Sequence, residues 1–390
     1  MDDYIDLKVS RKNLKLRVLI FVLAFLLATF SFSYGVYQLG KKDQGVYEIE
    51  ANRNSDVSFY DSGIKMYYYL DDDSNQIKSN LESITNIYSN SLANIYCLLD
   101  NKNTYDNYEN IASINQHLNQ EIELDETLFN IILDAYKLTN ENNGYSIFAG
   151  PIFESWEGIL NSTSQLDYDP INNSFEKERL ETIKELINDS NNISIDIIDN
   201  NKHIIKVNVS KQLINTLNKY EYQNGLIDLN LLKDSYIAKF LKDEFNKYNF
   251  TDGYLRFDSG LLINMSDRDF GNYILYSYDN NPVNIAEIKV ENKICITCFK
   301  KFSLGEDNYY QVDLLFRSPF ISSISGYPFD NLSSSYIYSF NYDPVKLVYD
   351  NIVLNQKGNN INNNYVYTVD NTVYTNTDIL INKDFKVVKP

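Results

Sequence analysis

Apolar and polar residues along this chain follow two different periods. Apolar side chains three or four residues apart predict helices over 74–99, 128–138 and 231–248. Asp343-Pro344 starts a further helix, and strand-like alternation returns from Tyr365. Alternating runs bounded by turn residues predict strands at 63–69, 193–199, 203–209, 253–257, 273–278, 285–290, 294–299 and 309–316. The pattern therefore predicts an α+β fold with helices lying on a mostly antiparallel sheet.

An uncharged apolar run from Val18 to Val36 stands apart from both patterns. At 1.5 Å per residue it is long enough to cross a hydrocarbon core of about 30 Å. The basic residues before it predict that 1–17 stays in the cytoplasm. They are Lys8, Arg11, Lys12, Lys15 and Arg17. A cleaved signal peptide is the alternative, with Ser31 and Ser33 as small residues near a cleavage site. We expect an uncleaved single-pass anchor in the cell membrane, with the bulk of the chain extracytoplasmic.

Composition adds one exclusion. The 390 residues are 44% hydrophobic, which is enough to fill a core, and the formal net charge is -18. Because Lys and Arg contacts to phosphate supply most non-specific nucleic-acid affinity, this charge argues against a nucleic-acid partner. A cationic partner would explain the acidic surface, but solubility explains it without a partner, and we favour solubility.

The cysteines and histidines do not form a recognisable site. Cys295 and Cys298 lie in the strand-like run KICITCF, where alternation places their side chains on opposite faces. A single CxxC without a second pair is weak support for zinc or redox chemistry. Cys97 lies in a helical pattern, and His117 and His203 have no cluster of ligands beside them in the sequence.

The stretch NGYSIFAGPIFESW, residues 143–156, contains the only Trp of the chain. Its Gly150-Pro151-Ile152 and the following Trp156 resemble the segment S/T-D-G-A-F-D-P-T-V-G-P-L…W of the FAD:protein FMN transferases, the ApbE family. The resemblance predicts that Trp156 lies on a turn lining one wall of the flavin-nucleotide cleft. The alternative is that Trp156 simply covers the core where a helix gives way to a loop.

Further segments resemble motifs of this family in the same order, over about residues 57–355. Residues 110–115 resemble S-E-I-S-x-I-N, and 225–229 stand at the start of D-L-G-G-I-A-K-G. Residues 254–260 resemble the strand that ends in N-L-G-G. Residues 325–334 resemble the T-G-Y-P turn and the L-x-S that follows it.

The resemblance implies a T-fold type domain that binds FAD with magnesium, splits the pyrophosphate and moves FMN to a Thr of an acceptor protein. Glycine turns let the backbone approach a nucleotide, and oxygen ligands hold the metal on the phosphates. The resemblance implies a metal ligand at Asp343. The positions that match the nucleotide-binding motifs are Gly150, Pro151, Trp156, Asp228, Ser259, Gly260, Gly326 and Pro328.

Many of the residues that define the family's motifs are replaced in this chain. Where the family has D-L-G-G-I-A-K-G, residues 228–235 read DLNLLKDS, without a glycine. D-P-T becomes Ser-Ile-Phe at 146–148, and T-S-G becomes Thr-Cys-Phe at 297–299. H-H-I-I-D-P becomes SPFISS at 318–323, which has neither imidazole nor carboxylate. We therefore assign no catalytic residue.

The metal motif A-D-x-x-x-T matches only in part. Asp343 keeps the carboxylate, whereas Leu347 replaces the Thr. An Asp followed by Pro344 is also a common helix start, with the Asp side chain capping the first turn. We favour the capping role over metal ligation.

Three functions follow, in order of preference. The first is a membrane-anchored, exported protein that has lost flavin transfer and serves as a binding or scaffold component of the cell envelope, with a protein partner. The second is an active FAD:protein FMN transferase with magnesium-dependent FAD binding. The third is an envelope structural protein without a nucleotide ligand. The expected organisation is a cytoplasmic segment 1–17, an anchor 18–36, a linker 37–56, an ApbE-like domain 57–355, and a loop and strand 356–390 completing it.

Overall fold

The computed structural model describes residues 14–39, 43–52, 63–106, 109–279, 281–290, 292–303, 305–358 and 361–389. The basic residues Lys8, Arg11 and Lys12 and the predicted domain start at 57 lie outside the described residues. The chain forms two compact units, one of residues 1–46 with 69–82 and one of 47–68 with 83–390.

The first unit contains the predicted apolar helix. Helix α1, Leu14–Leu39, includes a stretch Lys15–Gly35 with a mean hydropathy of 2.2, none of which is buried. By length and composition it can cross a membrane, as an anchor or a signal sequence would. The apolar helix predicted at this place is confirmed.

The main sheet has nine strands, most of them in the second unit. Its strands pair antiparallel wherever a register is defined, except that β15 and β16 are parallel. In spatial order the strands are β1 (Gly45–Ile49), β2 (Ile64–Leu70), β6 (Gly253–Phe257), β7 (Leu262–Asn264), β10 (Ile294–Lys300), β13 (Ser334–Ser339), β14 (Asn364–Val369), β15 (Thr372–Thr375) and β16 (Lys386–Val388).

Three smaller sheets accompany the large one. They are β3 (Glu121–Glu123) with β5 (Ile204–Val209) and β4 (Ile193–Asp199), β8 (Asn272–Asp279) with β9 (Asn281–Lys289), and β11 (Tyr310–Val312) with β12 (Leu315–Arg317). The prediction of one strand over 309–316 is wrong. Asp313, with φ of 52°, and Leu314 form a two-residue turn that folds this run into the β11–β12 hairpin.

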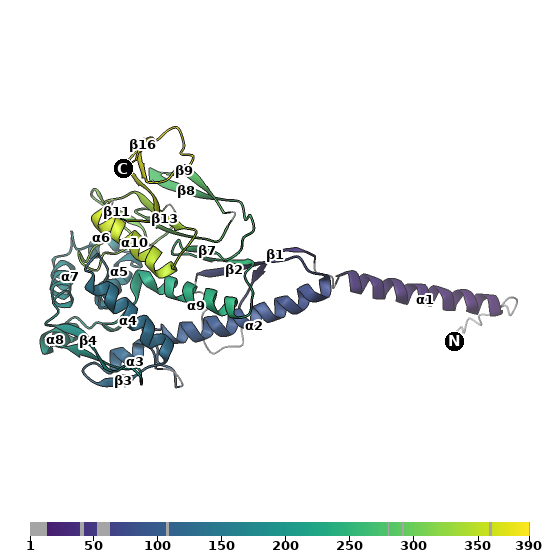
Figure 1. The fold of residues 1–390 in the computed structure, drawn as a ribbon, viewed down its shortest axis with the longest axis horizontal. Coiled ribbons are helices and arrows are strands. Elements are labelled where there is room, and N and C mark those ends of the chain that lie inside the picture. The colour runs from purple at the N-terminus through teal and green to yellow at the C-terminus, as the bar shows by residue number, and fades with distance from the viewer. Residues whose placement is uncertain are drawn as a thin grey trace, which may run out of the picture. The chain divides into compact units, whose positions relative to one another are not determined.

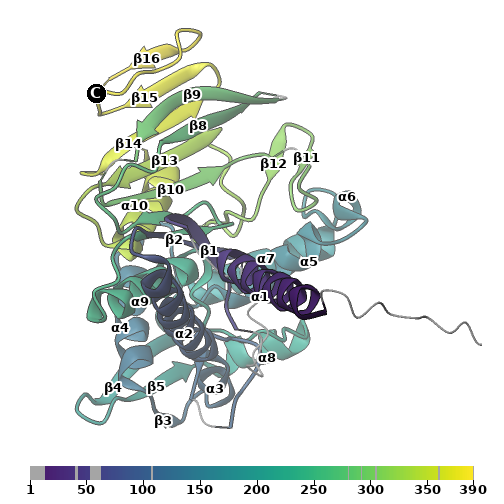
Figure 2. The same cartoon turned by 90° about the vertical axis from the view of Figure 1, so that its right-hand side faces the viewer.

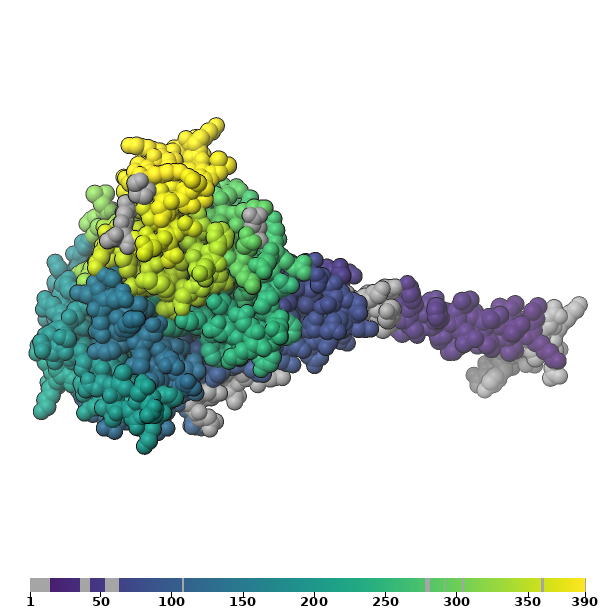
Figure 3. All heavy atoms as spheres, in the orientation of Figure 1, coloured from purple at the N-terminus to yellow at the C-terminus, as the bar shows by residue number. Residues whose placement is uncertain are grey.

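The helices cover one face of the sheet and flank its lower end (Figures 1 and 2). Their bounds are α2 Ser74–Leu98, α3 Ile111–Gln116, α4 Glu126–Asn140, α5 Gly150–Leu160, α6 Gln165–Tyr168, α7 Ser174–Ile187, α8 Lys211–Lys219, η1 Asn230–Leu232, α9 Lys233–Lys247 and α10 Pro344–Lys357. Helix α10 packs against β10, β13 and α9. In the space-filling view, β14–β16 in yellow and α7, α8 and β4 in teal lie at different ends of the second unit (Figure 3).

The two faces of the sheet have different neighbours. Ile294, Ile296 and Cys298 of β10 pack into a core that includes Leu275 of β8 and Ile285 of β9. Cys295, one position along, points the other way, toward the charges of α9 and α10. The predicted divergence of the two cysteines is confirmed, and the α+β fold with a mostly antiparallel sheet is confirmed with it. All three cysteines are buried and free.

Candidate functional site

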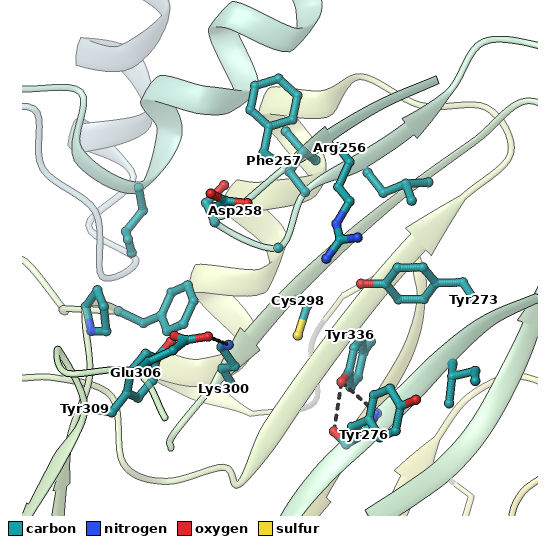
Figure 4. A pocket seen from close by; sticks show the side chains of 18 of the residues that line it. Arg256, Phe257, Asp258, Tyr273, Tyr276, Cys298, Lys300, Glu306, Tyr309 and Tyr336 are labelled. Carbon is teal, nitrogen blue, oxygen red and sulfur yellow. Dashed lines mark hydrogen bonds and ion pairs between the residues drawn. The ribbon is translucent and has the colours of Figure 1, made fainter. Parts of the chain in front are cut away.

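A cleft of about 1250 Å³ opens where several strand ends meet (Figure 4). Its walls come from β6 and β7, from the C-terminal half of β10, from β8 and from the loops 306–309 and 319–320. A volume of this size accommodates a nucleotide or another ligand of several rings, since ligand pockets typically measure about 300–1,000 Å³.

Four segments that resemble family motifs converge on this cleft. Ser259 and Gly260, from the segment that resembles N-L-G-G, line it together with Leu231, Cys298 and Phe320 from the other three. Gly260 has φ of 92°, and a Cβ there would lie 2.7 Å from the carbonyl oxygen of Cys298. Only glycine fits this position without strain, because an L side chain would clash with β10.

Aromatic rings and the Arg256 guanidinium line part of the cleft wall. Tyr67 and Tyr254 stack at 4.8 Å between centroids, and Phe270 meets Tyr254 at 5.0 Å. Figure 4 shows Arg256 pointing into the cavity on the side of Tyr273. Among the described residues the Arg256 guanidinium has no hydrogen bond or ion pair, so it is available to an anionic ligand.

Lys300 and Tyr336, two other polar residues of the cleft, are engaged with protein groups. The Lys300 ammonium lies 3.0 Å from a Glu306 carboxylate oxygen, and the Tyr336 hydroxyl donates to the Tyr276 carbonyl at 2.8 Å. Burial raises the pKa of the Cys298 thiol to about 11. The thiol therefore stays protonated at neutral pH and is a poor nucleophile.

Asp343, the predicted metal ligand, caps α10. Its carboxylate accepts hydrogen bonds from the backbone N–H groups of Val345 at 2.9 Å and Lys346 at 3.3 Å, and Lys239 of α9 donates to it at 2.6 Å. Burial alone would raise the pKa of the Asp343 carboxyl, but the Lys239 hydrogen bond and charge lower it overall. The favoured capping role is confirmed.

These surroundings do not fit a divalent metal. The Lys239 ammonium supplies a positive charge where a cation would bind, and Leu347, in the position of the family's Thr, is 1% exposed and apolar. Among the residues that the structure describes, no group of three or more His, Cys, Asp or Glu could hold a metal ion. Ligation by Asp343 stays a prediction with no supporting ligand set.

The segment that replaces the glycine-rich loop is filled by its own side chains. Leu229 and Leu232 are buried, and Asn230 adopts φ of 53° so that its amide donates to the Ser146 carbonyl at 3.0 Å. Asp228 accepts from Asn101 at 2.7 Å and from the Asn230 N–H at 2.7 Å. Burial raises the pKa of the Asp228 carboxyl. A phosphate cradle needs exposed backbone N–H groups, so this segment does not fit one.

Trp156 is not on a turn, and that prediction is wrong. Pro151 occupies the first turn of α5, a position that favours helix formation, and the Trp156 side chain is 0% exposed on the inner face of this helix. Its indole N–H donates to the carbonyl of Gly326 at 2.7 Å. The alternative, in which Trp156 packs into the core, agrees with this geometry.

The remaining predicted positions are distributed over the fold. Gly150 packs so closely that a Cβ would lie 2.5 Å from the Gly225 carbonyl oxygen, and Pro151 is buried beside it. Pro328 lines a separate cavity of about 360 Å³. The structure thus brings Ser259 and Gly260 to the main cleft and places the others in the core or elsewhere.

The sequence analysis did not identify Arg256 of the main cleft or a buried ion pair elsewhere in the fold. Arg256 had a usable signal, because alternation along β6 places it on the same face as Tyr254. The buried ion pair, between Asp169 and Arg317, had none. The Arg317 Nε lies 2.7 Å from an Asp169 oxygen, and its guanidinium carbon lies 5.3 Å from the Trp156 ring centroid.

Comparison with protein-family models and with curated proteins finds no match. Solved structures do match. The ApbE protein of Thermotoga maritima has a TM-score of 0.57 at 13% identity, over 83% of this chain and 94% of its own. The flavin transferase ApbE of Vibrio cholerae has a TM-score of 0.52 at 10% identity, over 88% and 98%. The flavinyl transferase ApbE of Pseudomonas stutzeri has 0.51 at 10%, over 88% and 96%. This chain therefore has the fold of the ApbE flavin transferases.

Proposed function

We propose that this protein is a membrane-anchored binding component of the cell envelope that uses the ApbE fold without flavin transfer. In this proposal residues 18–36 hold the chain in the membrane and the domain of 57–355, completed by 356–390, lies outside the cytoplasm. The domain holds a ligand in the main cleft and acts through a protein partner.

The ion pair between Lys239 and Asp343 carries the proposal. Metal-assisted phosphoryl chemistry needs a cation that polarises the phosphate oxygens. Here the carboxylate best placed to hold it is 2.6 Å from a lysine ammonium and also caps a helix. Removing one preorganised electrostatic group typically lowers a rate by about 10²- to 10³-fold. Loss of the metal and of the phosphate loop together leaves no effective transfer.

The lining of the cleft suits binding of a ligand without transfer of FMN from it. The stacked rings of Tyr67 and Tyr254 present an aromatic wall, and the unpaired guanidinium of Arg256 extends from the same strand as Tyr254. A planar ring system that carries an anionic group, such as a flavin nucleotide, suits both features. Such binding would not require magnesium.

The test is a fluorescence titration of the full-length chain in detergent with FAD, once with Mg²⁺ and once with EDTA. We expect equal affinity in both arms and no FMN on a Thr-containing acceptor protein. Arg256→Gln should weaken FAD binding about tenfold or more, since losing a charge-assisted contact costs about 1.5–3 kcal/mol. Lys202→Gln, an exposed cation in the β4–β5 turn, is the matched control and should change nothing.

Two results would replace this proposal. Magnesium-dependent FAD binding with FMN transfer, both lost in Asp343→Asn, would make the chain an active transferase. Absence of binding in both arms would favour a structural envelope protein that binds no nucleotide.

A further inference from the structure

Exposed apolar side chains lie on α6, in the loop after it, at the start of α7 and in the turn of the β11–β12 hairpin, a region that we call the patch. Its members are Leu166, Tyr168, Ile171 and Phe175, which are 44–56% exposed, and Leu314, which is 87% exposed. Figure 2 shows α6 and this hairpin as neighbours, and the Gln165 amide donates to the Asp307 carbonyl at 2.7 Å. Scattered exposed apolar residues are normal, but a cluster of this kind marks an interaction surface.

The patch is held rigidly. Asp169, fully buried between Tyr168 and Pro170, accepts hydrogen bonds from Arg317 and from the Tyr310 hydroxyl at 2.8 Å. These bonds fix α6 against the hairpin, because one carboxylate is shared by both strands β11 and β12. The apolar side chains are therefore exposed on a preformed surface, which lowers the entropy cost of binding.

The patch contains a knob, a hole and both signs of charge. Leu314 is the knob at the hairpin tip. The hole is the cavity of about 360 Å³, lined by Ile171, Leu315, Lys177 and Asp330 among others. Lys177 and Asp330 have no ion pair among the described residues. The same surface thus presents a protruding Leu314 and a cavity, and it presents both a positive and a negative charge.

We propose that this patch binds the same patch of a second copy of the chain, in a two-fold dimer. In an isologous interface residue i of one copy meets residue j of the other, and j meets i. Leu314 of each copy then enters the hole of its partner, and Lys177 of each copy pairs with the opposite Asp330. The apolar members form the desolvated centre, as in known interfaces. The inference does not depend on what the main cleft binds.

Sedimentation velocity of the full-length chain in detergent tests the dimer by charge exchange. We expect the wild type to dimerise, and Lys177→Glu or Asp330→Lys to lower the association constant about tenfold or more by placing like charges together. The double variant Lys177→Glu/Asp330→Lys restores opposite pairing and should recover association to within about threefold of wild type. Recovery by the double variant separates pairing from a folding defect.

Leu314→Asp provides a second measurement with a matched control. It should abolish the dimer, whereas Leu380→Asp should leave it intact, because Leu380 is 88% exposed but lies outside the patch. A wild type that stays monomeric at every concentration would overturn the inference. So would a dimer that survives Leu314→Asp and both charge reversals, because association would then run through another surface.

Discussion

Replacing Asp169 by Asn would remove the charge that balances Arg317 in the interior. The carboxylate is 0% exposed and accepts from Arg317 Nε at 2.7 Å, Arg317 Nη2 at 3.1 Å, the Tyr310 hydroxyl at 2.8 Å and the Ile171 N–H at 2.9 Å. Arg317 is itself 2% exposed. Asn keeps the shape and one accepting oxygen, but it leaves the guanidinium buried without a counter-charge.

The expected loss is about 3–5 kcal/mol of unfolding free energy, the usual cost of breaking a buried ion pair by removing one partner. Typical domains have only about 5–15 kcal/mol in total, so the effect is large. The full-length chain in detergent is unfolded in urea and followed by fluorescence. Trp156, the only Trp, lies 5.3 Å from the Arg317 guanidinium carbon and reports directly on this region.

An exposed pair and a double variant complete the assay. Lys102 and Glu157 are about half exposed, so Glu157→Gln should cost at most about 1 kcal/mol. Asp169→Asn/Arg317→Met removes both charges and should recover part of the loss. If Asp169→Asn costs no more than Glu157→Gln, the buried pair does not hold α6 to the hairpin and the reasoning fails.

The pH dependence of stability offers an independent check on Asp169. Burial would raise the pKa of its carboxyl, but hydrogen bonds from Arg317, Ile171 and Tyr310 and the Arg317 charge lower it overall. A lowered folded-state pKa gives stability that is present above the unfolded value of about 3.9 and is lost as the pH falls through the folded value. Wild type should therefore lose stability below about pH 4, and Asp169→Asn should show a smaller loss over that range.

Three further predictions concern other positions. Asp343→Ala should lower the thermal unfolding midpoint through a lost helix cap worth about 1 kcal/mol, whereas Asp343→Asn, also a good cap, should stay near wild type; equal losses would contradict the capping role. Gly225→Ala should cost about 1–3 kcal/mol in urea, because φ is 79° and the new Cβ would meet the Asn115 side chain; Gly158→Ala, a helical position with open space, should not destabilise and serves as control. Asp228→Asn should stabilise the protein at pH 7, because burial raises the pKa of this carboxyl and penalises its charged form, and the gain should shrink as the pH falls toward 4; unfolding midpoints across pH 4–8 measure it.

Local patterns in the sequence determined the elements whose causes are local. The Asp343-Pro344 start of α10, the hairpin of β4 and β5 and the apolar helix α1 each depend on residues within one turn or one pair of strands. The motif order of a known family led to the fold. Ser259 and Gly260, which the N-L-G-G match singled out, line the main cleft, and nucleotide binding by them stays a prediction. Where a local pattern allowed two conformations, the sequence misled, as when the Gly-Pro before Trp156 was taken as a turn and proved to start α5.

Tertiary structure alone decided which charges meet. Lys239 and Asp343 are 104 residues apart, and Asp169 and Arg317 are 148 residues apart, yet each pair is in direct contact. No spacing rule links such positions, because side-chain pairing across a fold depends on how whole elements pack and not on local period. The lysine at Asp343, the filled loop around Asp228 and the free Arg256 at the cleft are therefore properties of the packed molecule. The sequence indicated that the chain has this fold, and the packing decided that Asp343 meets Lys239 at the start of α10.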